Sequence, residues 1–309
     1  MRVDSRHTAK VMLALGTVYL VWGSSFLFTK IAVAVLPPAL FSGIRFVTAG
    51  ALLALIARFG RGGRLPQRAS DWRHVIVVGF FMIFISNGLN TWAMRYLPSN
   101  QAALLNGTSA FWIAGLGVFG KRGHPLTVWA IAGLGIGFLG TLMMLMSPAA
   151  ITNSWLAQGA VLTGCLSWAL GTLYYRSIDT DLSSLMFMGL QMLMGGLLLL
   201  GVGIVHGDAA FWTPTTAGLV ALFYLTFCSS CLAYTAYGWL SLNGAPALIG
   251  TYGYVNPAIA AFLGWQFLHE HLTLVQLAGM VIIIVGVGML TLPGGSLTDP
   301  KTLPEPKTQ

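Results

Sequence analysis

Few side chains in this sequence are placed where they could do acid–base or metal chemistry. The chain has 309 residues, and only eight are acidic. None lies in the middle of a long apolar run: Asp4, Asp71, Asp179, Asp181, Asp208, Glu270, Asp299 and Glu305. The six histidines also lie at the ends of such runs or between them. An intramembrane enzyme that uses a metal or a pair of aspartates would need an HExxH motif or a mid-span Asp pair, and the sequence has neither. We therefore expect no enzymatic activity, no cofactor and no metal.

Uncharged polar and aromatic side chains, by contrast, stand inside the apolar runs. Asn87 and Asn90 are three residues apart, as are Tyr234 and Tyr237, so each pair shares one helix face. An aromatic wall with a few polar groups suits a small, partly apolar, zwitterionic ligand. The residues predicted to line such a cavity are Trp22, Ser25, Asn87, Asn90, Asn106, Trp112, Trp168, Tyr234, Tyr237, Tyr252 and Asn256. The alternative is that the amides only bind neighbouring helices.

The elements that must position these side chains are membrane spans. The chain is 56% hydrophobic and only 8% charged, whereas a soluble domain carries about 25% charged residues. Its apolar residues come in runs of about 20, the length that crosses a bilayer as a helix. Cys228 and Cys231 have redox spacing but lie in such a run, where small packing residues are expected.

Breaks in the apolar pattern divide the chain into ten predicted transmembrane helices. They cover residues 11–35, 39–59, 74–96, 101–119, 126–146, 155–178, 182–206, 216–242, 246–268 and 272–292. The first run shows no clear cleavage site and is interpreted as an uncleaved span. The fold class is therefore an all-α polytopic membrane protein, with a short segment at residues 1–10 and a Pro-rich, disordered tail at 293–309.

The basic residues orient this arrangement. If the N-terminus is cytoplasmic, 13 of the 16 lysines and arginines fall on the cytoplasmic side, which is a strong positive-inside bias. Both termini are then cytoplasmic. Because the net charge of +8 is explained by this distribution and by contact with anionic lipid headgroups, no nucleic-acid partner is expected. Lys30 and Arg176 are interpreted as anchors at the two membrane surfaces.

The two halves of the sequence resemble each other. The segment from Thr17, TVYLVWGSSFLFTKIA, aligns with the segment from Thr163, TGCLSWALGTLYYRSI, and a second pair of segments aligns Arg45 with Gln191 at the same offset of 146 residues. Each half contains five spans, so the second copy is inverted relative to the first. Inverted repeats are typical of secondary transporters, with the substrate site between them. The predicted repeats are residues 11–148 and 149–292.

The residues also resemble a known family. VWGSSFLFTK, from Val21, is similar to the first helix of the drug/metabolite transporter superfamily, EamA type. YVNPAIAAFLGWQFLHEHLT, from Tyr254, is similar to the closing motif of that family, in which a proline is followed thirteen residues later by a glutamate, here Pro257 and Glu270. The resemblance covers residues 11–292 and implies a ten-helix transporter, in most cases an exporter of metabolites, amino acids or drugs.

The sequence departs from this pattern in its first half. Thr108 stands at the proline position and Lys121 at the glutamate position. Lys121 and Glu270 are predicted to make gate or helix-end contacts. The small four-helix relatives use a membrane glutamate in their first helix for proton exchange, and no carboxylate stands in YLVWGSSF here. The sequence therefore shows no proton relay of that kind, which fits a facilitator, an exchanger, or coupling through another group.

Arg45 is the one ionisable side chain well inside a predicted span. It holds its proton at physiological pH, so it cannot relay protons, but it could contact a substrate carboxylate or phosphate. The alternative is an arginine that reaches the headgroups or binds backbone carbonyls at a helix break.

The predicted function is therefore export or facilitated passage of small metabolites by alternating access in a bacterial inner membrane. The best estimate of the substrate is amino acids, including aromatic ones, with drug-like compounds as a further class. The expected partners are this solute and the lipid bilayer, and the chain is expected to act as a monomer or homodimer. The alternatives are a sodium-coupled organic-acid carrier of another inverted fold and a membrane sensor that does not transport.

Overall fold

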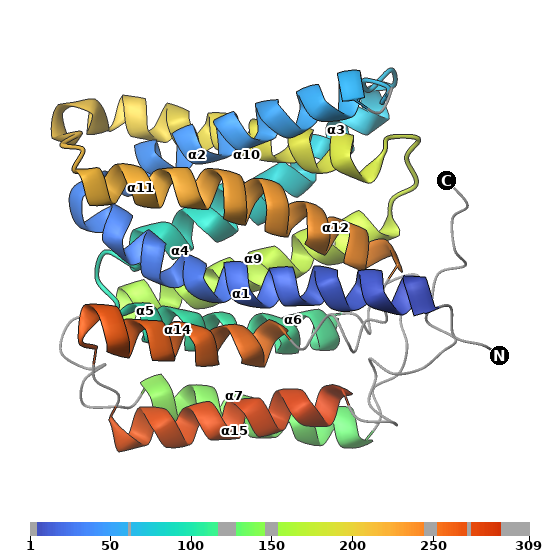
Figure 1. Cartoon of the computed structure of the whole chain (residues 1–309). Helices are drawn as coiled ribbons and strands as arrows, with labels where there is room; N and C mark the ends of the chain where they lie inside the picture. The colour runs from blue at the N-terminus through green and yellow to red at the C-terminus, as the bar shows by residue number, and fades with distance from the viewer. Residues whose placement is uncertain are drawn as a thin grey trace.

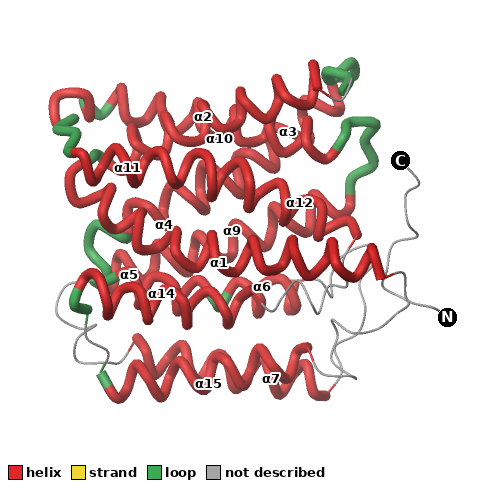
Figure 2. Tube along the Cα trace, viewed as in Figure 1, coloured by secondary structure: helices red, strands yellow, loops and turns green. Residues whose placement is uncertain are grey.

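The protein is described by a computed structural model that covers residues 5–60, 63–116, 128–145, 154–243, 252–270 and 273–291. These residues contain helices and loops and no strand, which confirms the all-helical prediction for this part of the chain (Figure 2). The helices of the first half are α1 (Ser5–Val35), α2 (Pro38–Leu55), η1 (Ile56–Gly60), α3 (Ala69–Val78), η2 (Gly79–Asn87), α4 (Gly88–Ala93), α5 (Ser99–Asn106), α6 (Ser109–Leu116) and α7 (Val128–Leu145).

The helices of the second half follow a similar order. They are α9 (Trp155–Ser177), α10 (Ser184–Val205), η4 (Asp208–Phe211), α11 (Thr216–Tyr224), η5 (Leu225–Ala233), α12 (Tyr234–Asn243), α14 (Tyr252–Leu268) and α15 (Leu274–Thr291). Six of the described helical segments are long and apolar enough to cross a membrane, and three shorter apolar helices accompany them in α7, α14 and α15. The chain is thus a polytopic membrane protein.

The helices lie roughly parallel or antiparallel in stacked layers (Figure 1). The pair α2 and α10 lies at one side of the bundle, and the pair α7 and α15 lies at the opposite side. Between them, α1 packs against α11, η5, α12 and α14, while α9 packs against η2, α4, α5 and α6. The long helices α1 and α9 therefore form two walls of the interior.

Glycines bring α2 and α10 into contact backbone to backbone. A methyl group placed on Gly50 would lie 2.5 Å from the amide nitrogen of Leu193, and one on Gly196 would lie 2.7 Å from the amide nitrogen of Val47. Only small residues allow such an approach between helices in a membrane. We call this contact the α2–α10 seam, which consists of Gly43 and Gly50 of α2 and of Gly189, Gly196 and Gly203 of α10.

The pair α7 and α15 is joined in the same way. A methyl group on Gly286 would lie 2.6 Å from the amide nitrogen of Gly137, and one on Gly140 would lie 2.7 Å from the carbonyl oxygen of Gly279. The sequence places Gly133, Gly137 and Gly286 at packing or dimer surfaces, and in the structure they pack the fifth and tenth spans of one chain together.

Corresponding elements of the two halves begin at a constant offset. Helix α2 begins at position 38 and α10 at 184, 146 positions later. The same 146 positions separate the starts of α7 and α15, at 128 and 274, and those of η2 and η5, at 79 and 225. Both η2 and η5 are π-helical, with wider turns than an α-helix.

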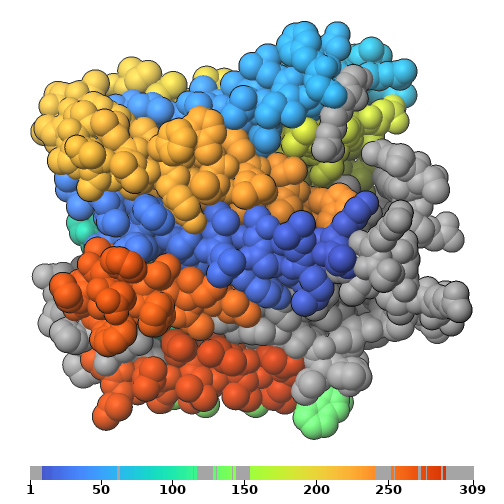
Figure 3. Space-filling model, viewed as in Figure 1, coloured from blue at the N-terminus to red at the C-terminus, as the bar shows by residue number. Residues whose placement is uncertain are grey.

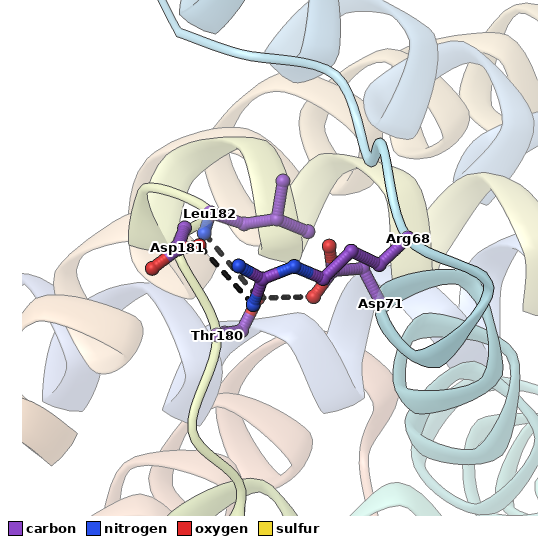
Figure 4. A network of polar contacts seen from close by, with 5 residues as sticks. All are labelled: Arg68, Asp71, Thr180, Asp181 and Leu182. Atoms are coloured by element: carbon purple, nitrogen blue, oxygen red, sulfur yellow. Dashed lines mark hydrogen bonds and ion pairs between the residues drawn. The ribbon is translucent and has the colours of Figure 1, made fainter.

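A polar network joins the start of α3 to the loop between α9 and α10 (Figure 4). The hydroxyl of Thr180 donates to Asp71 Oδ1 at 3.0 Å and accepts from the amide of Leu182 at 3.3 Å. Arg68 and Asp181 form an ion pair at 3.5 Å, with both side chains more than 70% exposed. Exposed pairs contribute little to stability, so this network fixes the loop more than it stabilises the bundle.

Several span boundaries differ from the sequence prediction. The third span starts at Ala69, five residues before the predicted start, and the ninth helix starts at Tyr252 within the described residues. The fourth predicted span consists of two short helices, α5 and α6, that meet at Gly107 and Thr108. The predicted tail at 293–309 lies outside the described residues, and the ten-span count and the repeat boundaries stay predictions.

Candidate functional site

A small cavity of about 130 Å³ lies in the interior of the bundle. Ten of the residues singled out in the sequence line it: Trp22, Ser25, Arg45, Asn87, Asn90, Asn106, Trp168, Tyr234, Tyr252 and Asn256. They come from both halves of the chain. Seen from one side, atoms of α1, α11, α12 and α14 cover this interior (Figure 3).

The cavity is also lined by residues that the sequence analysis did not predict to line it. They are Phe26, Thr29, Ser86, Thr91, Met94, Ala103, Gly107, Ser109, Ser229, Gly253 and Pro257. Ser86 precedes Asn87 and Thr91 follows Asn90, so they lie on the same two turns as the predicted amides. Small hydroxyl residues are too common in apolar helices to be selected by type alone. Their position next to the predicted amides was the available signal.

Arg45 reaches the cavity from α2 and is 5% exposed. Its Nε donates to the Ser230 hydroxyl at 2.9 Å, and its Nη2 donates to the Ser229 hydroxyl at 3.1 Å. The guanidinium carbon also lies 4.5 Å from the centre of the Phe46 ring. The alternative of an arginine that reaches the headgroups is thus wrong, because two serines of η5 hold the side chain inside. Those partners are hydroxyls, not the backbone carbonyls of a helix break.

Four aromatic rings surround the Trp22 ring. The ring centroid of Trp22 lies 5.9 Å from Trp168, 5.4 Å from Tyr234, 5.0 Å from Tyr237 and 5.6 Å from Tyr252. Most of these contacts are edge-to-face, the favoured arrangement of aromatic pairs. On α1 the cavity lining runs from Trp22 to Thr29, so the aromatic cluster bounds the cavity on the side of the α1 N-terminus.

The cavity amides are held by the turns that precede them. Asn90 Nδ2 donates to the Ser86 carbonyl at 2.9 Å, and Asn106 Nδ2 donates to the Ala102 carbonyl at 3.0 Å and to Asn90 Oδ1 at 2.5 Å. The last bond joins α4 to α5, so these amides link helices and line the cavity at once. Asn256 is 5% exposed, and its Oδ1 has no hydrogen-bond partner among the described residues.

Irregular helix positions the cavity side chains at three places. The π-helical η2 carries Ser86 and Asn87, and the side-chain Nδ2 of Asn87 donates to the carbonyl of Met82 at 2.7 Å. The π-helical η5 carries Ser229. Inside α14, Pro257 has no N–H, so the carbonyl of Gly253 loses its usual helical donor. π-helical turns are often found at functional sites.

Two charged side chains bind the helix ends that precede and follow the turn at residues 94–98, next to the cavity-lining residue Met94, and we call them the Lys30–Glu270 clamp. Lys30 Nζ donates to the carbonyls of Met94 and Leu97, both at 2.8 Å, at the end of α4. Glu270 accepts from the Ser99 amide at 2.6 Å and the Asn100 amide at 3.1 Å, at the start of α5. Positive charge at a helix C-terminus and negative charge at an N-terminus are both favourable.

The clamp changes the interpretation of Lys30. The C-terminal end of α4 lies beside the Lys30 ammonium. The ammonium therefore binds backbone carbonyls of the protein and not lipid headgroups. Glu270 reaches α5 because His269 adopts a left-handed backbone conformation, with φ of 53°, where α14 ends. Lys121, predicted to make a similar contact in the first half, lies outside the described residues.

Two predicted lining residues lie outside the cavity lining. Trp112 is 38% exposed. It follows Asn106 by six residues, roughly 240° around a helix, and the break at Gly107 and Thr108 separates the two. Tyr237 is buried behind Trp22 and contacts it without reaching the space itself. Within the described residues, no three His, Cys, Asp or Glu side chains gather as metal ligands would.

Comparison with known proteins places this chain in a family. The model of the EamA-like transporter family matches the chain twice, over residues 9–146 and 155–292. The chain belongs to the EamA-like transporter family. This EamA-like protein is 31% identical over 281 residues to the uncharacterized inner membrane transporter YedA of Escherichia coli, with 90% of each chain covered. It is also 29% identical over 287 residues to the uncharacterized transporter YvbV of Bacillus subtilis, again with 90% of each covered.

The fold of this EamA-like transporter has been seen in a solved structure as well. A crystal structure with 18% sequence identity superimposes with a TM-score of 0.69 and covers 93% of this chain and 98% of that one. The expectation of a drug/metabolite transporter of the EamA type is thus confirmed, and the chain is a multi-pass membrane transporter.

Proposed function

We propose that this EamA-like protein moves a small organic solute through its central cavity by alternating access between two inverted five-helix repeats. The observation that supports this is the cavity itself, which is enclosed by residues from both halves, such as Trp22 and Trp168. A site between repeats is where inverted-repeat transporters hold their substrate.

The constant offset between the halves supports the inverted repeat. Elements recur 146 positions later, and the family model matches once in each half. An odd number of spans per half turns the second copy over in the membrane. The ends of α1, η1 and α9 that carry Lys10, Arg58 and Arg176 lie at the same end of the bundle in Figure 1. We assign that end, and both termini, to the cytoplasm of a bacterial cell, in line with the positive-inside rule.

The lining supports amino acids, including aromatic and apolar ones, as the solute. Trp22, Trp168 and Tyr252 provide flat apolar faces for a side chain. Asn90 and Asn256 provide amide groups for the polar end of the solute. Export is the direction favoured by the family resemblance.

The proposal is tested by flux of labelled amino acids into proteoliposomes that contain the purified chain. Asn90→Ala removes an acceptor used by Asn106, and Trp168→Ala removes one wall, so both should lower flux about tenfold or more at equal protein content. Trp112→Ala is the matched control, because Trp112 lies outside the cavity lining.

Normal flux in both cavity variants would remove the cavity from the proposed mechanism. Dependence of the wild-type flux on a sodium gradient would instead favour the sodium-coupled carrier.

A further inference from the structure

The cavity contains a buried positive charge that has no counter-ion among the described residues. Arg45 is held by the hydroxyls of Ser229 and Ser230, which are neutral. The ion pairs between described residues involve other groups, Arg68 with Asp181 and His206 with Asp208, in the loops at the bundle ends. A charge inside a membrane protein is costly unless a partner or water compensates it, so an uncompensated one indicates a function.

The guanidinium also keeps donors free. Arginine has five N–H donors in a planar fork, and two of them serve the serine hydroxyls. These two are the side-chain hydrogen bonds that Arg45 makes to described residues, and the side chain is part of the cavity lining. Ser229 lines the cavity as well. This planar arrangement matches a carboxylate, which can take two parallel hydrogen bonds from one guanidinium.

The α14 side of the cavity offers hydrogen-bond acceptors. Asn256 Oδ1 has no hydrogen-bond partner among the described residues. The Gly253 carbonyl lacks its usual helical donor because Pro257 has no N–H. Both residues line the cavity from α14, which lies on the other side of α1 from α2 in Figure 1. The cavity therefore has a cation on the α2 side and hydrogen-bond acceptors on the α14 side.

The polarity is specific to one half of the chain. The position that corresponds to Arg45 in the second half is Gln191, which is fully buried, is neutral and is not part of the cavity lining. Its Nε2 faces the sulfur of Met188 at 3.3 Å. The matched position therefore does not compensate the charge of Arg45, nor does it provide a second anion contact.

We propose that Arg45 and Ser229 form an anion subsite that takes the carboxylate of the transported solute, and that organic cations without a carboxylate are excluded. This inference rests on the proposed function, because it names the head group that the same cavity requires. An amino group on the solute is optional and would meet the acceptors of α14. An organic cation would place a second positive charge beside Arg45.

The test compares three molecules with the same aromatic ring. L-phenylalanine carries a carboxylate and an ammonium, 3-phenylpropionate carries only the carboxylate, and 2-phenylethylamine carries only the ammonium. Their binding to the full chain in lipid nanodiscs is followed by tryptophan fluorescence, since Trp22 and Trp168 line the cavity. Their flux is measured in proteoliposomes with the same protein.

The wild-type chain should bind and transport the two carboxylates at least about tenfold better than the amine. Arg45→Gln, which copies Gln191, should weaken the two carboxylates about ten- to a hundredfold and leave the amine unchanged or better bound. Arg45→Lys should restore part of the preference, because it returns the charge without the planar fork. Arg68→Gln is the matched control and should keep the wild-type preference, since the Arg68 side chain is 73% exposed and lies outside the cavity lining.

The outcomes separate this inference from the proposed function. If the wild-type chain transports all three molecules equally, the anion subsite is wrong while transport through the cavity stands. If Arg45→Gln weakens all three equally and lowers the melting temperature, Arg45 is a structural tie between α2 and η5, and the subsite is again wrong. If none of the three binds or is transported, the subsite and the amino-acid assignment both fail.

Discussion

The α2–α10 seam and the central cavity lie next to each other and use the same helix in opposite ways. On α2, Gly43 and Gly50 are seven residues apart and therefore share one face, which meets the backbone of α10. Arg45 follows Gly43 by two residues, roughly 200° around the helix, and points to the cavity. One face of α2 packs through glycines, and the other carries a charge that has no counter-ion in the part of the chain that the structure describes.

The difference shows how a membrane protein can be both fixed and adaptable. In the seam, backbone atoms meet directly, so there is no side chain whose rotation could absorb a movement. Around the cavity, aromatic edges and amide groups meet through side chains, and several polar atoms still lack a partner. We infer that α2 and α10 stay together during transport, and that rearrangement takes place in the helices around the cavity.

The largest effect is expected from a side chain placed in the seam. In Gly50→Val the added Cβ would lie 2.5 Å from the Leu193 nitrogen and 2.6 Å from the Gly189 oxygen, and backbone atoms cannot rotate away. Overpacking of this kind costs about 1–3 kcal/mol or more. We expect a large fall in melting temperature and in the yield of monodisperse protein.

Gly201→Val is the matched control, since Gly201 is on α10 and a Cβ there meets nothing within 4 Å. Equal melting temperatures for the two variants would show that the seam is not a rigid contact.

A middle effect is expected at the edge of the cavity, in the Lys30–Glu270 clamp. Glu270→Gln keeps the shape but removes the charge that the Ser99 and Asn100 amides and the Ser99 hydroxyl bind. Hydrogen bonds to a charged group are stronger than neutral ones by about 1 kcal/mol. The cavity should therefore open to labelling several-fold more often in the variant. The readout is labelling of Ser25→Cys by a membrane-impermeant maleimide, with the native cysteines replaced.

The neighbouring variant His269→Gln provides the control, because the His269 side chain is exposed. Labelling that rises no more in Glu270→Gln than in this control would mean that the clamp does not limit access to the cavity.

The smallest effect is expected at an exposed ion pair that belongs neither to the seam nor to the cavity. Arg68→Ala removes the exposed ion pair with Asp181 (Figure 4). Such pairs contribute about 0–1 kcal/mol, so melting temperature and flux should both stay within experimental error of the wild type. A fall as large as that of Gly50→Val would mean that the loop between α9 and α10 is as important to the bundle as the seam.

The sequence was sufficient for the helices and for much of the cavity wall. Uninterrupted apolar runs require helices in a membrane, because each backbone group must be satisfied within its own segment. The mid-span amides and aromatics, such as Asn90 and Trp168, were informative for the same reason, since lipid offers them no partner. Trp112 shows the limit of prediction from sequence, because the break between α5 and α6 changes which face of the helix the residue occupies.

The environment of Arg45 could not be predicted. Its partners Ser229 and Ser230 are more than 180 positions away and lie in a π-helical segment. No local pattern marks those two serines among the many hydroxyls of the apolar spans. The same holds for Lys30, whose acceptors are backbone carbonyls that any sequence would provide.

The lone charge of Arg45 also makes the molecule sensitive to voltage. Moving one elementary charge through the whole membrane potential changes the free energy by about 2.3 kcal/mol for each 100 mV. An empty cavity presents that charge to the field when the surrounding helices rearrange, whereas a bound carboxylate neutralises it. The membrane potential should then act on the empty transporter and on the loaded transporter with different force.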